Sequence, residues 1–250
     1  EVTDVLSAPL FPKPIKANLS GKVLLAEDDE MLQQLITLLL QKLGLEVTVV
    51  ENGHQLVEYA LAGEFDLIMS DINMPIMGGI EAVTLLKKAG YDSHFVALTA
   101  NAMTYEVESY IAAGFDAHLA KPIERENFVR VISTLLNVKS DVDDIKVSEP
   151  VIQELQQKFI QSLPNIINEF KEMYDNKDWQ QLQFIAHRLN GSSSVFNFMM
   201  LREVAESIEL GFINKEFPLA EKALALQMNK LFEMVNELLS EDVINSSTGK

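Results

Sequence analysis

The sequence predicts two domains: an α/β doubly wound domain with a five-stranded parallel sheet, followed by a separate all-α four-helix bundle. Three observations support this prediction. Up to about residue 138, short apolar segments of strand length alternate with helical patterns, as in a parallel sheet covered on both faces. After residue 150 only helical periodicity remains. A polar segment over residues 139–150 separates the two patterns and is predicted to be a hinge.

Five predicted strands and five predicted helices alternate in the first domain, residues 21–138. The strand segments are mostly β-branched or aliphatic, and they cover residues 22–26, 45–50, 65–70, 95–98 and 117–120. The helical segments cover residues 30–43, 55–62, 80–89, 105–113 and 125–136. Glycine commonly ends a helix in the left-handed conformation, and the first four helices are followed by Gly44, Gly63, Gly90 and Gly114.

Four helical patterns predict an up-down bundle over residues 151–240. The first pattern begins at Ile152, and Pro164 predicts a kink or a break within it. Asp178, with Gln181 three residues later, resembles a capping box and predicts the start of the second helix. The last two patterns cover residues 201–212 and 220–239. Residues 1–20 are predicted to form a linker, and residues 241–250 a polar tail.

The composition limits the partners and the chemistry. Lys and Arg number 20 against 37 Asp and Glu, so the formal net charge is −17, which disfavours nucleic acid and anionic lipid as partners. The absence of cysteine excludes disulfides, cysteine-ligated metals and thiol nucleophiles. No apolar run approaches the ~18 residues of a membrane helix, and no signal-peptide pattern is visible. We therefore expect a cytoplasmic fragment, whether or not its parent protein is anchored in the inner membrane.

Five polar residues follow or end predicted strands and should meet at one edge of the sheet. Glu27 and Asp28 follow the first strand, Asp71 the third and Lys121 the fifth, and Thr99 ends the fourth. Three crowded carboxylates repel one another unless a cation lies between them, and an all-oxygen site suits Mg²⁺. The hydroxyl and the ammonium would stabilise a phosphoryl group on Asp71. Any one of these acids alone is more commonly a solvated helix cap.

Residues 22–136 resemble a response-regulator receiver domain, which has a flavodoxin-like fold. The stretches that carry the resemblance are VLLAEDDE, DLIMSDINMPIMGG, ALTANAM and AHLAKPI. The resemblance implies that Asp71 is phosphorylated and binds Mg²⁺ together with Glu27, Asp28 and the backbone carbonyl of Asn73. It also implies that Thr99 binds the phosphoryl group and that Lys121 is its counter-ion.

The same resemblance implies strand order 2-1-3-4-5 and a cis peptide before Pro122. His118 occupies the switch position that is commonly Tyr or Phe in this family, so the switch pair would be Thr99 and His118. Asp29 lies just outside the usual acidic pair, and we expect it to cap the following helix.

His187 is the candidate functional residue of the second domain. On a helical wheel it lies away from the apolar face of its helix, so it should be exposed. Gly191, one turn later, removes a side chain beside the imidazole, which suggests that something approaches closely. A solvated surface histidine or a helix break at Gly191 are the alternatives. No second histidine stands three or four residues away, which disfavours a metal site.

Residues 151–240 resemble a histidine phosphotransfer (HPt) domain, whose motif is His-x-x-Lys-Gly followed by small residues. His187, Gly191 and the serines at 192–194 match this motif, whereas Asn190 stands where lysine is usual. The resemblance implies that His187 is the phosphorylated residue. The order of the two domains resembles the C-terminal part of hybrid sensor histidine kinases of bacterial two-component systems.

These resemblances predict a phosphorelay fragment. Asp71 would accept a phosphoryl group from a histidine kinase and pass it to His187, which would phosphorylate a downstream response regulator. No ATP-binding kinase core is present in this sequence. One alternative is a receiver used mainly as a protein-docking module, which the intact acidic set disfavours. Another is a haloacid-dehalogenase-like phosphatase, which usually has a second Asp where this sequence has Asn73.

A docking surface is predicted around His187, involving Phe184, Asn190 and Gly191. Phe184 lies one turn before His187 and outside the apolar face of the helix. We expect it to pack on the apolar flank of a receiver's first helix, such as Met31 and Leu38. The alternative is that Phe184 packs on the N-terminal arm of its own domain or on the hinge.

Overall fold

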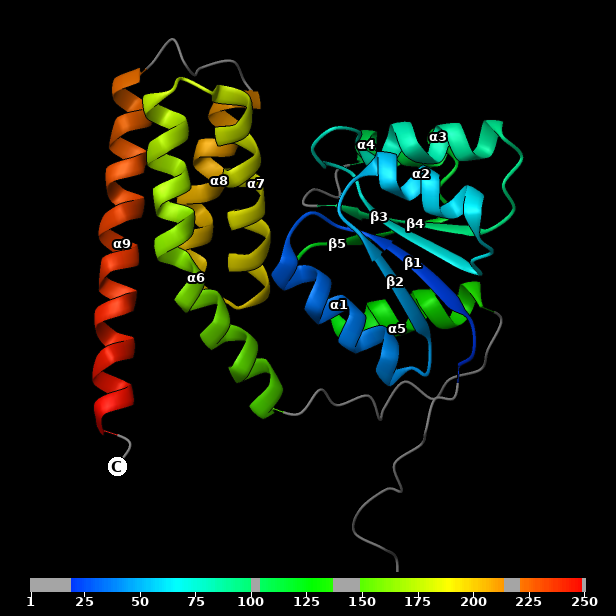
Figure 1. Ribbon diagram of the computed structural model, residues 1–250, viewed down its shortest axis with the longest axis horizontal. Helices are drawn as coiled ribbons and strands as arrows, with labels where there is room; N and C mark the ends of the chain where they lie inside the picture. Colours follow the sequence, from blue (N-terminus) through cyan, green and yellow to red (C-terminus); the bar gives the residue numbers. More distant parts are fainter. Residues whose placement is uncertain (1–18, 100–103, 137–148, 214–220, 249–250) are drawn as a thin grey trace, which may run out of the picture.

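The structure is a computed structural model that describes residues 19–99, 104–136, 149–213 and 221–248 of the chain. It contains a sheet domain and a helical bundle that lie side by side (Figure 1). The predicted linker up to residue 18, most of the predicted hinge and the stretch 100–103 lie outside the described residues. Among the described helices, none is both long and apolar enough to cross a membrane.

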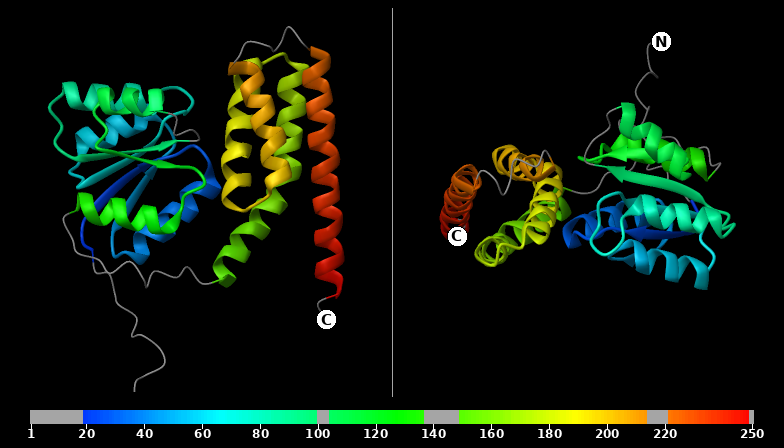
Figure 2. Two further views of the ribbon diagram at one scale, coloured as in Figure 1. Left: turned by 180° about the vertical axis from the view of Figure 1, so that it is seen from behind. Right: turned by 90° about the horizontal axis from the view of Figure 1, so that it is seen from above.

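The sheet domain alternates strands and helices in the predicted order. Its five strands are parallel and lie in the order β2-β1-β3-β4-β5, which confirms the predicted topology. The strands are β1 Lys22–Ala26, β2 Glu46–Val50, β3 Leu67–Asp71, β4 His94–Thr99 and β5 Ala117–Ala120. The helices are α1 Glu30–Lys42, α2 Gly53–Ala62, α3 Gly79–Lys88, α4 Thr104–Ala113 and α5 Arg125–Leu135. Helices α1 and α5 cover one face of the sheet, and α2, α3 and α4 cover the other (Figure 2).

Small differences from the predicted boundaries have local causes. β3 begins two residues later than predicted, and the amide of Phe65 donates to the Tyr91 hydroxyl at 3.1 Å rather than to a neighbouring strand. Three of the four glycines have the expected positive φ, namely Gly44, Gly90 and Gly114. Gly63 differs: it caps α2 with an extended backbone (φ −143°). The peptide bond before Pro122 is cis, as the resemblance implies.

The second domain is a bundle of four helices: α6 Glu149–Asp175, α7 Trp179–Val195, α8 Met199–Ile213 and α9 Glu221–Thr248. Asp178 caps α7 as predicted, since its side chain accepts from the amide of Gln181 at 3.1 Å. Pro164 does not break α6, which continues on both sides of it. The predicted polar tail from residue 241 is helical as far as Thr248, where α9 ends.

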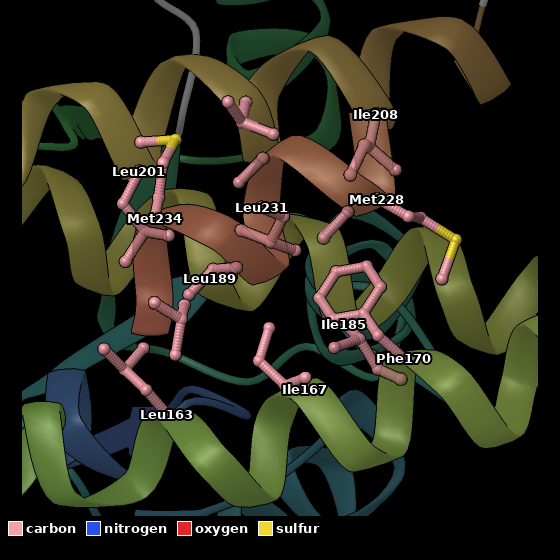
Figure 3. Packing of buried hydrophobic residues seen from close by; sticks show 14 of the residues in the cluster. Leu163, Ile167, Phe170, Ile185, Leu189, Leu201, Ile208, Met228, Leu231 and Met234 are labelled. Carbon is pink, nitrogen blue, oxygen red and sulfur yellow. The ribbon is translucent and has the colours of Figure 1, made fainter. Parts of the chain in front are cut away.

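The apolar face of each bundle helix meets those of the other three. Figure 3 shows Leu163 and Phe170 of α6, Leu189 of α7, Ile208 of α8 and Leu231 of α9 packed together. The bundle core also reaches the sheet domain, because Met31 and Leu35 of α1 pack against it while half-buried. Contacts between α1 and α7 therefore join the two domains.

Candidate functional site

Three carboxylates meet at the carboxyl edge of the sheet. Glu27 and Asp28 follow β1, and Asp71 ends β3, the neighbouring strand. One carboxylate oxygen from each lies within 4.8 Å of the other two. Glu27 and Asp71 are almost completely buried. The predicted convergence of these acids is therefore present in the structure.

Lys121, directly after β5, neutralises part of this charge. Its Nζ lies 2.7 Å from Asp71 Oδ2 and 2.8 Å from Glu27 Oε2, and all three side chains are buried. Burial alone would lower the pKa of Lys121, but the two carboxylates outweigh it and raise this pKa above its usual value. Burial likewise favours neutral Asp71, yet Lys121 and His187 hold the pKa of Asp71 well below its ordinary range. Asp71 is therefore held in its anionic form.

One carboxylate oxygen of Asp28 lacks a hydrogen-bond partner. Its Oδ1 is buried and has no hydrogen-bond partner in the structure. Burial, reinforced by the charge of Asp71, raises the pKa of Asp28 to about 6. A cation between Asp28, Glu27 and Asp71 would partner this oxygen and relieve the repulsion. The donor set, which is all oxygen, suits a hard divalent cation.

Thr99 lies at the end of β4, buried at the same edge of the sheet. Its Oγ1 lies 3.0 Å from the hydroxyl of Tyr110, a buried residue of α4. His118 lies on β5 and is half-buried. The structure thus brings a second aromatic residue, Tyr110, to the hydroxyl that was predicted to pair with His118. Sequence reasoning missed Tyr110, because its periodicity marks it only as a core residue of α4.

His187 of α7 lies at the acidic edge of the other domain. Its Nε2 lies 3.5 Å from Asp71 Oδ2, and its Nδ1 lies 2.8 Å from Glu209 Oε1. The prediction that His187 is exposed is wrong for the assembled chain, where the residue is only 5% exposed. A helical wheel identifies the core of one helix only, and here the sheet domain covers the other side.

The environment of His187 favours its charged form. Burial would lower the pKa of His187, but the hydrogen bonds to Asp71 and Glu209 outweigh this and raise the pKa to about 10. The Glu209 carboxylate also accepts a hydrogen bond from the Asn190 amide at 3.0 Å. Asn190 is therefore buried and bound within its own domain, rather than placed on a docking rim.

Glu209 is a further residue that sequence reasoning missed. It lies in α8, 22 residues after His187, and is 7% exposed. One signal could have found it: Glu209 follows Ile208 and stands four residues after Ala205, both of which are buried core residues. An acid at the edge of an apolar helix face requires a partner.

Gly191 and Ser192 of α7 also touch the sheet domain. A Cβ added at Gly191 would lie 3.2 Å from Cδ1 of Leu32 in α1, so the predicted close approach exists. The Ser192 hydroxyl donates to Asp29 Oδ2. Asp29 caps α1, as predicted, by accepting from the amides of Met31 and Leu32 through Oδ1.

Phe184, a predicted docking residue, is half-buried and lines a cavity of about 440 Å³ between the domains, which Pro75, Ile76 and Met173 also line. On the sheet domain this lining includes residues after β3, and none of the lining residues belongs to α1. Met31 instead packs against the bundle core, and Leu38 is half-buried.

Comparison with known proteins identifies both halves of the chain. Residues 23–133 match the family model of the response regulator receiver domain, and residues 154–241 match that of the Hpt domain. Signal transduction histidine-protein kinase BarA of Escherichia coli is 28% identical over 230 residues, covering 80% of this chain and 25% of BarA. Sensor protein GacS of Pseudomonas syringae is 30% identical over 139 residues, covering 51% of this chain and 15% of GacS. The chain thus spans at most a quarter of these curated relatives.

A solved structure resembles the first half. The receiver domain of sensor histidine kinase PA1611 from Pseudomonas aeruginosa, described with a magnesium ion in its active-site cleft, is 31% identical. The match has a TM-score of 0.45 and covers 48% of this chain and 99% of that chain.

The protein is a component of two-component phosphorelay signalling. Within that class, the chain joins a response regulator receiver domain to an Hpt domain and is related to hybrid histidine kinases.

Proposed function

We propose that Asp71 accepts a phosphoryl group and passes it to His187 of the same chain. The observation that carries this proposal is the 3.5 Å distance between Asp71 Oδ2 and His187 Nε2. In the transfer, the bond between phosphorus and the Asp71 oxygen breaks, and a bond between phosphorus and Nε2 forms. Asp71 leaves as a carboxylate, so the step needs no further reactant. Enzymatic phosphoryl transfer depends mainly on this kind of positioning and on charge neutralisation.

Glu209 supports the role of His187 as the acceptor. A nucleophilic Nε2 needs its lone pair, so the charged ring first has to lose its Nε2 proton to solvent, and the remaining ring proton has to be on Nδ1. Glu209 Oε1, at 2.8 Å from Nδ1, can accept that proton in a hydrogen bond and thereby select this tautomer. The same carboxylate would stabilise the positive charge that the ring gains once Nε2 carries phosphorus.

The acidic edge supports the role of Asp71. Glu27, Asp28, Asp71 and the backbone carbonyl of Asn73 would hold Mg²⁺, and the unpartnered Asp28 Oδ1 fits such a ligand set. The bound ion would neutralise the charge of the phosphoryl oxygens. Lys121, at 2.7 Å from Asp71, would act as the second counter-charge.

Thr99 and His118 would act as the switch pair. The Thr99 hydroxyl would donate to the phosphoryl group, and His118 would follow its movement. Tyr110 contacts that hydroxyl and would move with it.

A histidine kinase domain would supply the phosphoryl group, and a downstream response regulator would take it from His187. The predicted domain limits, 21–138 and 151–240, and a cytoplasmic location are part of this proposal. A receiver that serves only for docking is disfavoured, because docking does not require a buried lysine between two carboxylates.

Stability to mild acid and to alkali tests the proposal, because phosphoaspartate survives brief mild acid but not alkali, whereas phosphohistidine survives alkali but not acid. The full chain is incubated with Mg²⁺ and labelled acetyl phosphate. We expect acid-stable and acid-labile label in the wild-type chain, acid-stable label alone in His187→Gln, and none in Asp71→Asn. Full labelling of Asp71→Asn would refute the assignment of Asp71. Acid-labile label in His187→Gln would refute the assignment of His187.

A further inference from the structure

Three residues of α7 contact the receiver domain: His187, Gly191 and Ser192. His187 and Gly191, four residues apart, share a side of the helix, and Ser192 lies about 100° further round it. His187 faces Asp71, Gly191 faces Leu32, and the Ser192 hydroxyl donates to Asp29. The first contact brings the reacting atoms together and the second only permits a close approach. The third is a directional bond between the two domains.

Asp29 is held in place by hydrogen bonds within its own domain, independently of Ser192. Its Oδ1 accepts from the amide of Met31 at 2.8 Å and from that of Leu32 at 3.0 Å. This cap fixes the carboxylate at the beginning of α1 and leaves Oδ2 directed at α7. Because the acceptor is preorganised, little freedom is lost when a donor arrives.

The bond between Asp29 and Ser192 is also shielded from water. Asp29 is 8% exposed and Ser192 only 1%. A buried carboxylate oxygen that loses its donor keeps the whole cost of its desolvation. A site that is built to bind a hydroxyl therefore discriminates strongly against a partner that lacks one.

We propose that the Asp29–Ser192 hydrogen bond sets the register of His187 on Asp71 and makes this HPt domain selective for receivers with a carboxylate capping α1. The inference rests on the proposed transfer from Asp71 to His187. Asp29 and Ser192 are positioning residues, since neither would touch the phosphoryl group. The selected partner class is defined by one side chain: a receiver with a serine cap would offer no second oxygen to Ser192.

A double-mutant cycle in the full chain tests this inference. Ser192→Ala removes the donor, and Asp29→Ser removes Oδ2 while keeping a good helix cap. Phospho-Asp71 is prepared with acetyl phosphate and Mg²⁺, the donor is removed, and the appearance of acid-labile label is followed in a single turnover. Each single variant should slow transfer about 10- to 100-fold, which is typical for a hydrogen bond to a charged group. The double variant should be no slower than the slower single variant.

Three controls separate positioning from damage. The labelling rate of Asp71 by acetyl phosphate should be unchanged in every variant, because neither residue belongs to the acidic cluster. Ser194→Ala, two residues further along α7, should transfer at the wild-type rate. Asp29→Asn keeps the cap and offers an amide to the Ser192 hydroxyl, so its loss should be smaller than that of Asp29→Ser.

Two results would overturn this inference but not the proposed transfer step. One is a wild-type transfer rate in Ser192→Ala. The other is a double variant whose rate loss equals the product of the two single losses. A wild-type chain that forms phospho-Asp71 but never phospho-His187 would instead overturn the transfer step, and this inference with it.

Discussion

Replacement of Gly191 by alanine should affect stability and transfer in opposite directions. Gly191 lies within α7, where alanine is favoured over glycine by about 0.5–1 kcal/mol. The new methyl group would lie 3.2 Å from Cδ1 of Leu32, closer than the ~3.5–4.0 Å of an ordinary carbon contact. Leu32 is 1% exposed in the receiver core, so it has little room to move. The domains would have to separate by a few tenths of an ångström.

The size of each effect follows from these contacts. Overpacking at a tight contact costs about 1–3 kcal/mol, so Gly191→Ala should slow transfer from phospho-Asp71 to His187 about 5-fold or more. The bundle should meanwhile become more stable by up to about 1 kcal/mol. Trp179, the one tryptophan of the sequence, lies at the start of α7 and reports bundle unfolding in urea. A single-turnover assay measures the transfer rate.

The outcome separates two explanations of this glycine. A more stable bundle with slower transfer is the expected result, and Ser194→Ala should leave the transfer rate unchanged. A more stable bundle with wild-type transfer would refute the reasoning, because the close approach of α7 to Leu32 would then play no part in the reaction. A less stable bundle would show that the glycine serves the helix itself.

Four further predictions concern the residues around His187 and Asp71. Glu209→Gln should lower the pKa of His187 below about 10 and reduce acid-labile label, because the amide carries no charge; histidine NMR measures the pKa, and an unchanged value would contradict this. Without metal, the contacts of charged His187 should stabilise the chain fully below pH ~6.5 and lose this effect as the pH rises through about 10. The free energies of unfolding in urea of wild type and His187→Gln should therefore converge at high pH. A difference between them that persists at high pH would contradict this prediction. Asp28→Asn should raise the Mg²⁺ concentration needed for labelling while still allowing it, since a ligand charge is lost but not Asp71; abolished labelling at saturating Mg²⁺ would be inconsistent with that role. Asn190→Lys should raise steady-state acid-labile label, because a cation near the phosphoryl group stabilises phospho-His187. The rise should be several-fold at most, because the new ammonium would also pair with Glu209; a fall would mean that the native hydrogen bond from Asn190 to Glu209 is needed.

The sequence predicted the receiver site well because that site depends on local order. Glu27, Asp28, Asp71 and Lys121 come directly after strands or end them, and a parallel sheet brings such positions to one edge whatever the rest of the chain does. The close approach at Gly191 could also be predicted, because glycine destabilises a helix interior and its presence there indicates that a side chain would be in the way.

The contacts between the domains could not be predicted in the same way. Asp29 and Ser192 are 163 residues apart, and no periodicity connects them. The burial of His187 likewise depends on a second domain that a helical wheel does not contain. Phe184 was assigned to the α1 flank because that flank is apolar, yet in the structure it lines a cavity with Pro75 and Ile76.

The enclosure of His187 has a consequence for the timing of the signal. The imidazole of His187 is held between Glu209 and Asp71 and is only 5% exposed, so under the proposed relay it would serve one receiver at a time. Loading and delivery would then be successive events, and the two domains would have to separate between them. A tighter interface would load the histidine faster but release it later, so the rate of signal transfer would be greatest at an intermediate strength of docking.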